Sequence, residues 1–255
     1  MCRKAVPAFI ISDERESGEL TMGQFDFFYI FKVIPVLLPY LGVTALIAVL
    51  TLLLGLGFGG LLAWAKLGKN KIAKGLANGY TSVLRCTPSI ILLFLCYYGI
   101  PKIFGQFGIN LNDIDQIYSV LVAFVLLYSA IMSELIRSTY EAIDKGQFDA
   151  AATVGLTSWQ TLRRIILPQC FYIALPNLGN SIITLLKESS LAFTIGLVDI
   201  MGKAKLVISL NYGNHALEIY LALSIVYWVL TLLIAKGTKM LENSFRMGRR
   251  TAGNC

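Results

Sequence analysis

The sequence predicts an all-α membrane protein with five transmembrane helices. Of its 255 residues, 56% are hydrophobic and only 15% are charged, whereas soluble domains contain roughly 25% charged residues. The scarce charged residues are separated by long apolar stretches, and a bilayer core requires about 20 apolar residues in helical form. The formal net charge is +7, and in a chain this apolar an excess of basic residues indicates cytoplasmic loops beside membrane spans. A disordered chain and a soluble nucleic-acid binder are therefore excluded.

Each predicted span occupies one apolar stretch between charged residues. Pro35 and Pro39 divide the first stretch, so we expect a short interfacial segment before the first span. Pro101 is expected to close the second span, because proline disfavours helix continuation. The predicted spans cover residues 41–64, 80–100, 117–136, 170–198 (broken near 187–190) and 219–235.

The distribution of positive charge predicts the orientation of these spans, because cytoplasmic loops are enriched in Lys and Arg. The loops after the first and third spans, Arg85 just beyond the first loop, and the residues after the fifth span together hold 14 of the 22 basic residues, against 7 on the opposite side. Lys66 and Lys69 are among those assigned to the first loop. We therefore expect an external N-terminus and a cytoplasmic C-terminus in a multi-pass protein of the cell membrane.

The chain divides into three predicted parts. Residues 1–21 contain clustered acidic residues and an apolar run too short for a signal-peptide core. We predict that they are an extension, not native to the protein, which would then start at Met22. Residues 22–246 form the predicted transmembrane domain, and residues 247–255 form a C-terminal tail.

Several chemistries are not expected. The five Cys residues are scattered without a C-x-x-C pair, and His215 is the only histidine, so we predict no disulfide framework and no metal site. Residues 55–60 match G-x-G-x-x-G, but they lie inside a span, where small residues let helices pack closely. No G-x-x-x-x-G-K-[ST] sequence occurs. We therefore predict no catalytic residues, no bound cofactor and no ATP hydrolysis by this chain alone.

The segment of residues 137–168 has a helix–glycine–helix pattern. Residues 147–154 favour a helix, Gly155 favours its end, and Thr157 or Ser158 can cap a second helix. The small Ala side chains of the first helix leave room for a partner groove. These residues fit a partner-docking elbow and a solvated connector equally well.

The fourth predicted span carries a stripe of polar residues at steps of three and four. Its adjacent charges, Lys187 and Glu188, each cost about 2.5–3.5 kcal/mol at a helix centre on insertion scales. The stripe indicates either a solute path or polar contacts between helices. Pro176 and the run that follows Leu186 predict a discontinuous helix whose freed backbone groups could bind a zwitterion. The candidate path residues are Asn177, Asn180, Ser181, Thr184, Lys187, Glu188, Ser189 and Ser190.

The spacing within residues 137–168 resembles the EAA loop of ABC-importer permeases. In that loop an acidic-Ala-Ala run is followed by three residues, Gly, nine residues, Ile, one residue and Leu-Pro. Every interval fits here, and the one departure is Asp where the family usually has Glu. The residues that the resemblance assigns to ATPase coupling are Asp149, Ala150, Ala151, Gly155, Ile165, Leu167 and Pro168.

Two further motifs resemble the polar amino-acid branch of these permeases. Arg85-Cys-Thr87-Pro88 is similar to the Arg-Gly/Ser-Thr-Pro run of their second span. Gly179-Asn180, followed by the run from Leu186 to Leu191, is similar to their Gly-Asn and Leu-Lys-Asp/Glu-Thr/Ser-Ser-Leu motifs. The resemblance covers about residues 22–246 and implies the type I ABC importer permease fold.

The resemblance also implies several partners. These are a cytoplasmic ATPase that binds ATP and Mg, a second permease in a homo- or heterodimer, an extracytoplasmic solute-binding protein and a polar amino-acid substrate. The elbow of residues 147–158 would dock on the ATPase. The neutral Ser181 beside the path favours a net-neutral substrate such as glutamine or cystine.

Two other functions are compatible with a multi-span chain. A secondary transporter would work without an ATPase, but it would show an internal repeat, and we find no convincing one. An integral-membrane enzyme could use Lys187 and Glu188 as acid and base. Acid–base catalysis needs separately placed groups, whereas adjacent residues of a helix point in different directions.

Overall fold

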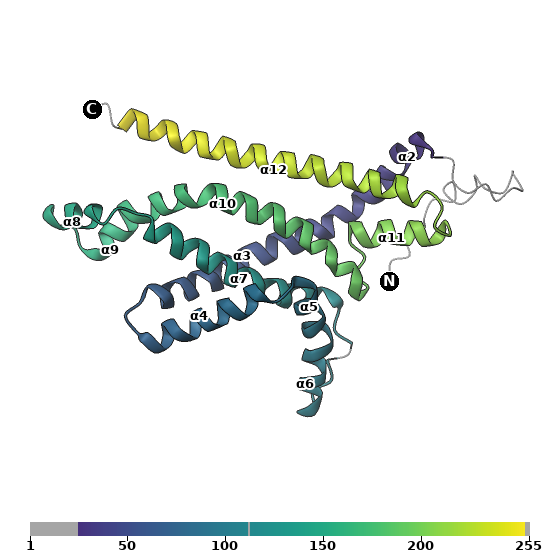
Figure 1. Ribbon diagram of the computed structural model, residues 1–255, viewed down its shortest axis with the longest axis horizontal. Helices are drawn as coiled ribbons and strands as arrows, with labels where there is room; N and C mark the ends of the chain where they lie inside the picture. The colour runs from purple at the N-terminus through teal and green to yellow at the C-terminus, as the bar shows by residue number, and fades with distance from the viewer. Residues whose placement is uncertain (1–24, 112, 253–255) are drawn as a thin grey trace, which may run out of the picture. The chain divides into compact units, whose positions relative to one another are not determined.

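The computed structural model describes residues 25–111 and 113–252, and all regular elements in these ranges are helical (Figure 1). The predicted extension, residues 1–21, lies outside them. The elements before the elbow are α2 (Phe27–Leu37), η1 (Leu38–Tyr40), α3 (Leu41–Leu67), α4 (Lys71–Cys86), α5 (Ser89–Phe94), the π-helix η2 (Leu95–Gly99), α6 (Ile100–Gln106) and α7 (Gln116–Glu141). Those that follow are α8 (Gly146–Thr153), α9 (Ser158–Thr161), the π-helix η3 (Leu162–Ile166), α10 (Leu167–Glu188), the 3-10 helix η4 (Ser189–Ile195), α11 (Ile200–Leu210) and α12 (Ala216–Ala252).

Four helical stretches in the described ranges are long and apolar enough to cross a membrane. They are Phe27–Leu67, Ser89–Gln106, Gln116–Glu141 and Ala216–Ser244. Helix α10, which holds most of the fourth predicted span, has 22 residues but is not among them. The all-helical prediction is therefore confirmed, whereas the count of five spans remains a prediction.

The chain forms two compact units. Among the described residues, the first contains 25–46 and 190–230, and its apolar core is built from α2, α11 and the first part of α12. Asp26 starts α2 by accepting a hydrogen bond from the Phe28 amide (2.8 Å). Asp199 starts α11 in the same way through the Gly202 amide (2.8 Å). Local capping therefore sets where both helices of this core begin.

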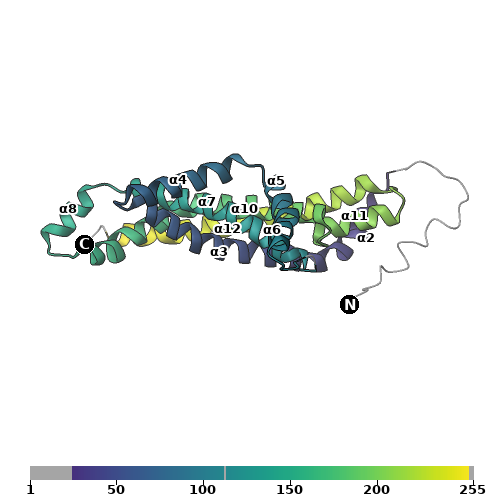
Figure 2. The ribbon, with the colours of Figure 1, turned by 90° about the horizontal axis from the view of Figure 1, so that it is seen from below.

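The second unit contains residues 47–189 and 231–255, and α7 is its central helix. Helices α4 and α10 both pack against α7, and Figures 1 and 2 show each of them running beside it. Helix α3 approaches α7 closely, because a Cβ atom at Gly55 would lie 3.1 Å from Tyr128 Cβ. Close packing at small residues is typical of membrane helices. The interpretation of residues 55–60 as a helix-packing sequence is thus confirmed.

Two predicted span boundaries near prolines are wrong. The second span was expected at residues 80–100, but its first residues belong to α4, which ends at Cys86. Thr87 is extended, with ψ of 125°, because proline at position 88 disfavours the helical conformation of the residue before it. Pro101 does not close a helix but lies at the start of α6, directly after the π-helix η2, in a helical stretch that continues to Gln106.

Three other predicted spans end too early, because they were bounded by the ends of the apolar stretches. Helix α3 begins at Leu41 as predicted but runs to Leu67. Helix α7 continues past the predicted end at residue 136, because Arg137 forms intrahelical ion pairs with Glu134 and Glu141. Helix α12 likewise extends beyond residues 219–235 and continues to Ala252, into the predicted tail. Polar surface turns prolong these helices beyond the apolar parts of the sequence.

Candidate functional site

Helices α8 and α9 form the predicted helix–glycine–helix elbow. Gly155 ends α8 with a φ of +78°, a conformation that glycine adopts without steric cost. Its amide donates to the Ala152 carbonyl (3.0 Å), and the Leu156 amide donates to the Ala151 carbonyl (3.1 Å). This pair of bonds is the Schellman arrangement that satisfies the last carbonyls of a helix.

A capping box starts the second helix of the elbow. The Gln160 amide donates to Thr157 Oγ1 (3.3 Å), and the Thr157 amide donates back to the Gln160 side chain (2.9 Å). The two caps fix the turn between the helices on both sides. The local structure predicted for this segment is therefore confirmed.

The exposed surface of the elbow combines polar, small and large apolar side chains. Asp149 and Ala150 are exposed, whereas Ala151 is buried at 2% exposure. Val154 and Trp159 project into solvent, with exposures of 74% and 66%. The sequence did not single out these two, because one apolar residue at a helix end or in a four-residue helix carries no periodic signal.

The remaining residues assigned to coupling lie at the start of α10. Ile165 is half-buried in η3, and Leu167 and Pro168 are exposed in the first turn of α10. The Gln169 side chain donates a hydrogen bond to Gln147 of the segment that forms α8. The elbow is therefore tied back to the base of α10.

A cavity of about 860 Å³ lies in the second unit, between α7, α10 and the end of α4. Its wall combines apolar side chains of α7 with polar side chains from all three segments. The polar groups that line it are Arg85, Thr87, Ser89, Tyr128, Glu134, Ser138, Asn177, Asn180, Ser181, Thr184 and Glu188. The volume lies within the range of small-molecule sites, about 300–1,000 Å³.

The cavity brings two predicted motifs together. Arg85, Thr87 and Pro88 face it from the break between α4 and α5, opposite the polar stripe of α10. The sequence could not show that these two motifs line the same cavity, because the two segments lie about ninety residues apart. The extended conformation at Thr87 is what brings this segment to the cavity wall.

Three predicted path residues are not part of the cavity wall. Lys187 is exposed but does not line the cavity, because successive helix residues point about 100° apart. Ser189 is buried, and its hydroxyl donates to the Leu186 carbonyl (2.9 Å). Ser190 belongs to the first unit. Lys187, Ser189 and Ser190 thus lie outside this cavity wall, and their place in the solute path stays a prediction. Helix α10 runs without a break through Pro176 and ends at Glu188, where η4 follows, so the helix is interrupted near residues 187–190 but not at Pro176.

The Glu188 carboxylate faces the cavity and has a partner on α7. Tyr128 Oη donates a hydrogen bond to Glu188 Oε2 (3.2 Å). Ser181 and Thr184 instead turn their hydroxyl protons to carbonyls of the preceding helix turn. Within the described part of the chain, the side-chain amide groups of Asn177 and Asn180 and the Arg85 guanidinium make no hydrogen bond. These three groups line the cavity and are available to a solute.

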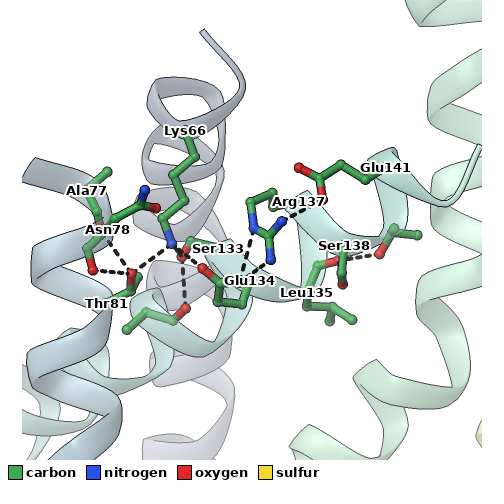
Figure 3. Close-up of polar contacts among 12 residues, drawn as sticks. Lys66, Ala77, Asn78, Thr81, Ser133, Glu134, Leu135, Arg137, Ser138 and Glu141 are labelled. Atoms are coloured by element: carbon green, nitrogen blue, oxygen red, sulfur yellow. Dashed lines mark hydrogen bonds and ion pairs between the residues drawn. The ribbon is translucent and has the colours of Figure 1, made fainter. Parts of the chain in front are cut away.

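A second polar cluster, which sequence analysis did not anticipate, surrounds Lys66 (Figure 3). Its ammonium group pairs with Glu134 Oε1 (2.6 Å) and donates to Thr81 Oγ1 (2.9 Å) and Ser133 Oγ (3.0 Å). The Lys66 side chain has 0% exposure. The assignment of Lys66 to a loop is therefore wrong: the residue lies in the last turn of α3, where α4 and α7 supply acceptors for all three of its protons.

The same Glu134 carboxylate is shared with a second cation. Arg137 Nη2 lies 2.7 Å from Glu134 Oε2, and Arg137 Nη1 lies 2.5 Å from Glu141 Oε2. The four charges of this group, here called the Lys66 cluster, thus consist of Lys66, Glu134, Arg137 and Glu141. The sequence contained a signal for this polar face of α7: Ser129 and Ser133 are one helical turn apart, and Glu134 follows directly.

Comparison with known proteins identifies the chain's relatives. Residues 55–247 match the family described as "Binding-protein-dependent transport system inner membrane component". The L-cystine transport system permease protein TcyL of Bacillus subtilis is 41% identical, over 82% of this chain and 87% of that protein. The arginine transport system permease protein ArtQ of the same organism is 34% identical, over 84% of this chain and 94% of that protein.

Solved structures agree with the sequence relatives. The structure described as "Crystal structure of an amino acid ABC transporter with histidines" is 32% identical and has a TM-score of 0.77, over 87% of this chain and 100% of that chain. An inward-facing structure of the MetNI methionine ABC transporter shares the fold, with a TM-score of 0.62 at 17% identity over 87% of this chain and 99% of that chain. The chain therefore belongs to the family of binding-protein-dependent transport system inner membrane components, multi-pass proteins of the cell membrane, and within it to the permease components of amino-acid ABC transporters.

Proposed function

We propose that the chain is the membrane-spanning subunit of an ATP-driven importer for an amino acid without net charge. The cavity of the second unit supports this proposal most directly. Its size suits an amino acid, and it offers Arg85 and Glu188 together with the amides of Asn177 and Asn180. A zwitterion carries one carboxylate and one ammonium group, for which a guanidinium and a carboxylate are the matching partners.

The elbow suggests how ATP hydrolysis is coupled to this path. The chain has no P-loop of its own, so a partner ATPase would bind ATP and Mg. The exposed Val154 and Trp159 side chains would enter a groove on that ATPase, with Gly155 holding the turn between them. Asp149, Ala150 and Ala151 of α8 and the base of α10, at Ile165, Leu167 and Pro168, would transmit its movement to the cavity-lining helix.

The complete transporter would contain two permease subunits, as a homo- or heterodimer, and a solute-binding protein outside the membrane. In this arrangement the elbow and the C-terminus lie in the cytoplasm and the N-terminus lies outside, in agreement with the excess of basic residues on the elbow side. Residues 22–246 would form the permease domain. The solute-binding protein would deliver the amino acid when ATP binding turns the cavity outward.

Reconstitution of the permease with its ATPase and solute-binding protein into proteoliposomes tests the proposal. We expect uptake of labelled amino acid to require ATP on the side of the membrane that the ATPase faces. Uptake should stop when the ATPase is omitted. Competition with a panel of amino acids should give preference to net-neutral ones, such as glutamine or cystine. Uptake driven by an ion gradient without the ATPase would instead identify a secondary transporter.

A further inference from the structure

The Lys66 cluster places a cation directly behind the wall of the cavity. Glu134 lines the cavity and is 23% exposed at its side chain, whereas the Lys66 side chain behind it has 0% exposure. The carboxylate therefore faces any solute, and the ammonium group that compensates it does not. A buried lysine in a membrane helix is expensive and usually has a functional reason.

The arrangement of hydrogen bonds holds the side chain of this lysine in place. The Thr81 and Ser133 hydroxyls donate their own protons to the backbone carbonyls of Ala77 (2.9 Å) and Ala130 (2.8 Å). Their oxygen atoms are thereby free to accept from Lys66. Together with Glu134, they give the ammonium group three acceptors on two different helices. These three acceptors match the three protons of the Lys66 ammonium group, whereas an apolar side chain at position 66 would offer them no donor.

The charges of the Lys66 cluster cancel. Lys66 and Arg137 balance Glu134 and Glu141, and the remaining charged groups of the cavity wall, Arg85 and Glu188, also cancel each other. Without Lys66, Glu134 would share Arg137 with Glu141, and the wall would carry one uncompensated negative charge. Such a charge at the edge of a partly enclosed cavity would attract a cationic side chain.

We propose that Lys66 determines the charge preference of the cavity: by neutralising Glu134 from behind, it makes the site select amino acids without net charge over cationic ones. The inference rests on the proposed function and names the residue that sets the substrate class. Lys66 touches no solute, so it acts through Glu134 as a positioning residue. Specificity of this kind depends on the difference between two affinities, not on the strength of either.

Equilibrium binding of labelled glutamine and arginine to the purified permease–ATPase assembly, without solute-binding protein, measures that difference. We expect the wild type to bind glutamine more tightly. The Lys66→Met variant should shift the arginine-to-glutamine affinity ratio toward arginine by about tenfold, which corresponds to about 1.4 kcal/mol. The Glu134→Gln variant should shift it in the opposite direction.

The double variant Lys66→Met/Glu134→Gln is the matched control, because it removes both charges and keeps both side-chain volumes. Its affinity ratio should return to within about twofold of the wild type. A purely structural role for Lys66 would weaken both ligands equally and leave the ratio unchanged, and this result would overturn the inference.

Two other outcomes also decide the matter. If Lys66→Met does not accumulate in the membrane, Glu134→Gln still tests the sign of the effect, and an unchanged ratio in that variant overturns the inference. A wild type that prefers arginine overturns it together with the net-neutral substrate class of the proposed function, while leaving an ATP-driven amino-acid importer intact. Absence of ATP-dependent uptake by the wild-type transporter would contradict the proposed function itself.

Discussion

Gly59 of α3 lies directly against Met132 of α7, so close that a Cβ atom on the glycine would stand 2.8 Å from Met132 Cβ and 2.9 Å from the Ser129 carbonyl oxygen. Two residues earlier, Gly57 has no atom within 4 Å of the corresponding position. One helix therefore contains a glycine that packing requires and another that it does not. The pair allows the contact between α3 and α7 to be tested.

We predict that Gly59→Ala lowers the stability of the detergent-solubilised protein by about 1–3 kcal/mol, because an added methyl group overpacks the contact. Gly57→Ala should be neutral or raise stability by up to about 1 kcal/mol, since alanine is the better helix former. Thermal unfolding of the two variants measures the difference. Equal midpoints would mean that α3 and α7 do not pack in this register.

The elbow gives a prediction about coupling. Gly155→Val forces a β-branched residue into a φ of +78°, which L-residues adopt only at a cost of about 1–2 kcal/mol. We expect ATP-dependent uptake to fall at least about tenfold while the amount of protein in the membrane stays the same. The control is Gly75→Val, at an exposed α4 glycine with no atom within 4 Å of an added Cβ. Normal uptake by Gly155→Val would contradict the proposed docking role.

Adjacent residues at the end of α10 should differ in their effect on transport. Glu188→Gln removes a carboxylate that lines the cavity and accepts the Tyr128 hydrogen bond, so we expect uptake to fall by about tenfold or more. Lys187→Gln should change uptake by less than about threefold, because the Lys187 side chain does not line the cavity. Initial uptake rates in the same proteoliposomes compare the two. Equal losses would place both side chains in the path.

Asp199 predicts a pH dependence of stability in the first unit. This side chain is fully buried at the start of α11, and burial raises its pKa to about 6, against about 3.9 in an unfolded chain. Between these values the folded protein holds a proton that the unfolded chain has lost, so stability decreases as pH rises from about 4 to 6 and is level above that.

The Asp199→Asn variant separates this charge effect from helix capping, because Asn can still accept the Gly202 hydrogen bond. The stabilities of wild type and variant, measured by thermal unfolding, should diverge as pH rises from about 4 to about 6, with the variant less pH-dependent and up to about 3 kcal/mol more stable above pH 6. Parallel curves from pH 4 to pH 7 would show that Asp199 does not titrate in this range.

Local signals predicted the elbow well. A glycine in a left-handed turn and a capping Thr act within a few residues, so Gly155 and Thr157 could be assigned without knowledge of the rest of the fold. The first residue of α3 was also predicted, because Pro39 places a helix start close to Leu41. Pro88 was an equally local signal for the break after α4, but the apolar run on both sides of it suggested one continuous span.

Convergence between distant segments could not be predicted. Lys66 reads as the first loop residue because it follows a long apolar run. Its burial depends on Thr81 and Glu134, which reach it from two other helices. Similarly, periodicity placed both Lys187 and Glu188 on the stripe, and the packing of α10 against α7 puts only Glu188 in the cavity wall. Such contacts depend on how helices are paired, and neither composition nor periodicity records that pairing.

The ion pair between Lys66 and Glu134 has an evolutionary consequence. A lineage that loses the lysine keeps an uncompensated acid in its transport path, and one that loses the acid keeps a buried cation with too few acceptors. Positions 66 and 134 should therefore change together among related permeases, or change when the transported solute changes its charge. An unmatched substitution at either position would mark a protein that has acquired a different cargo.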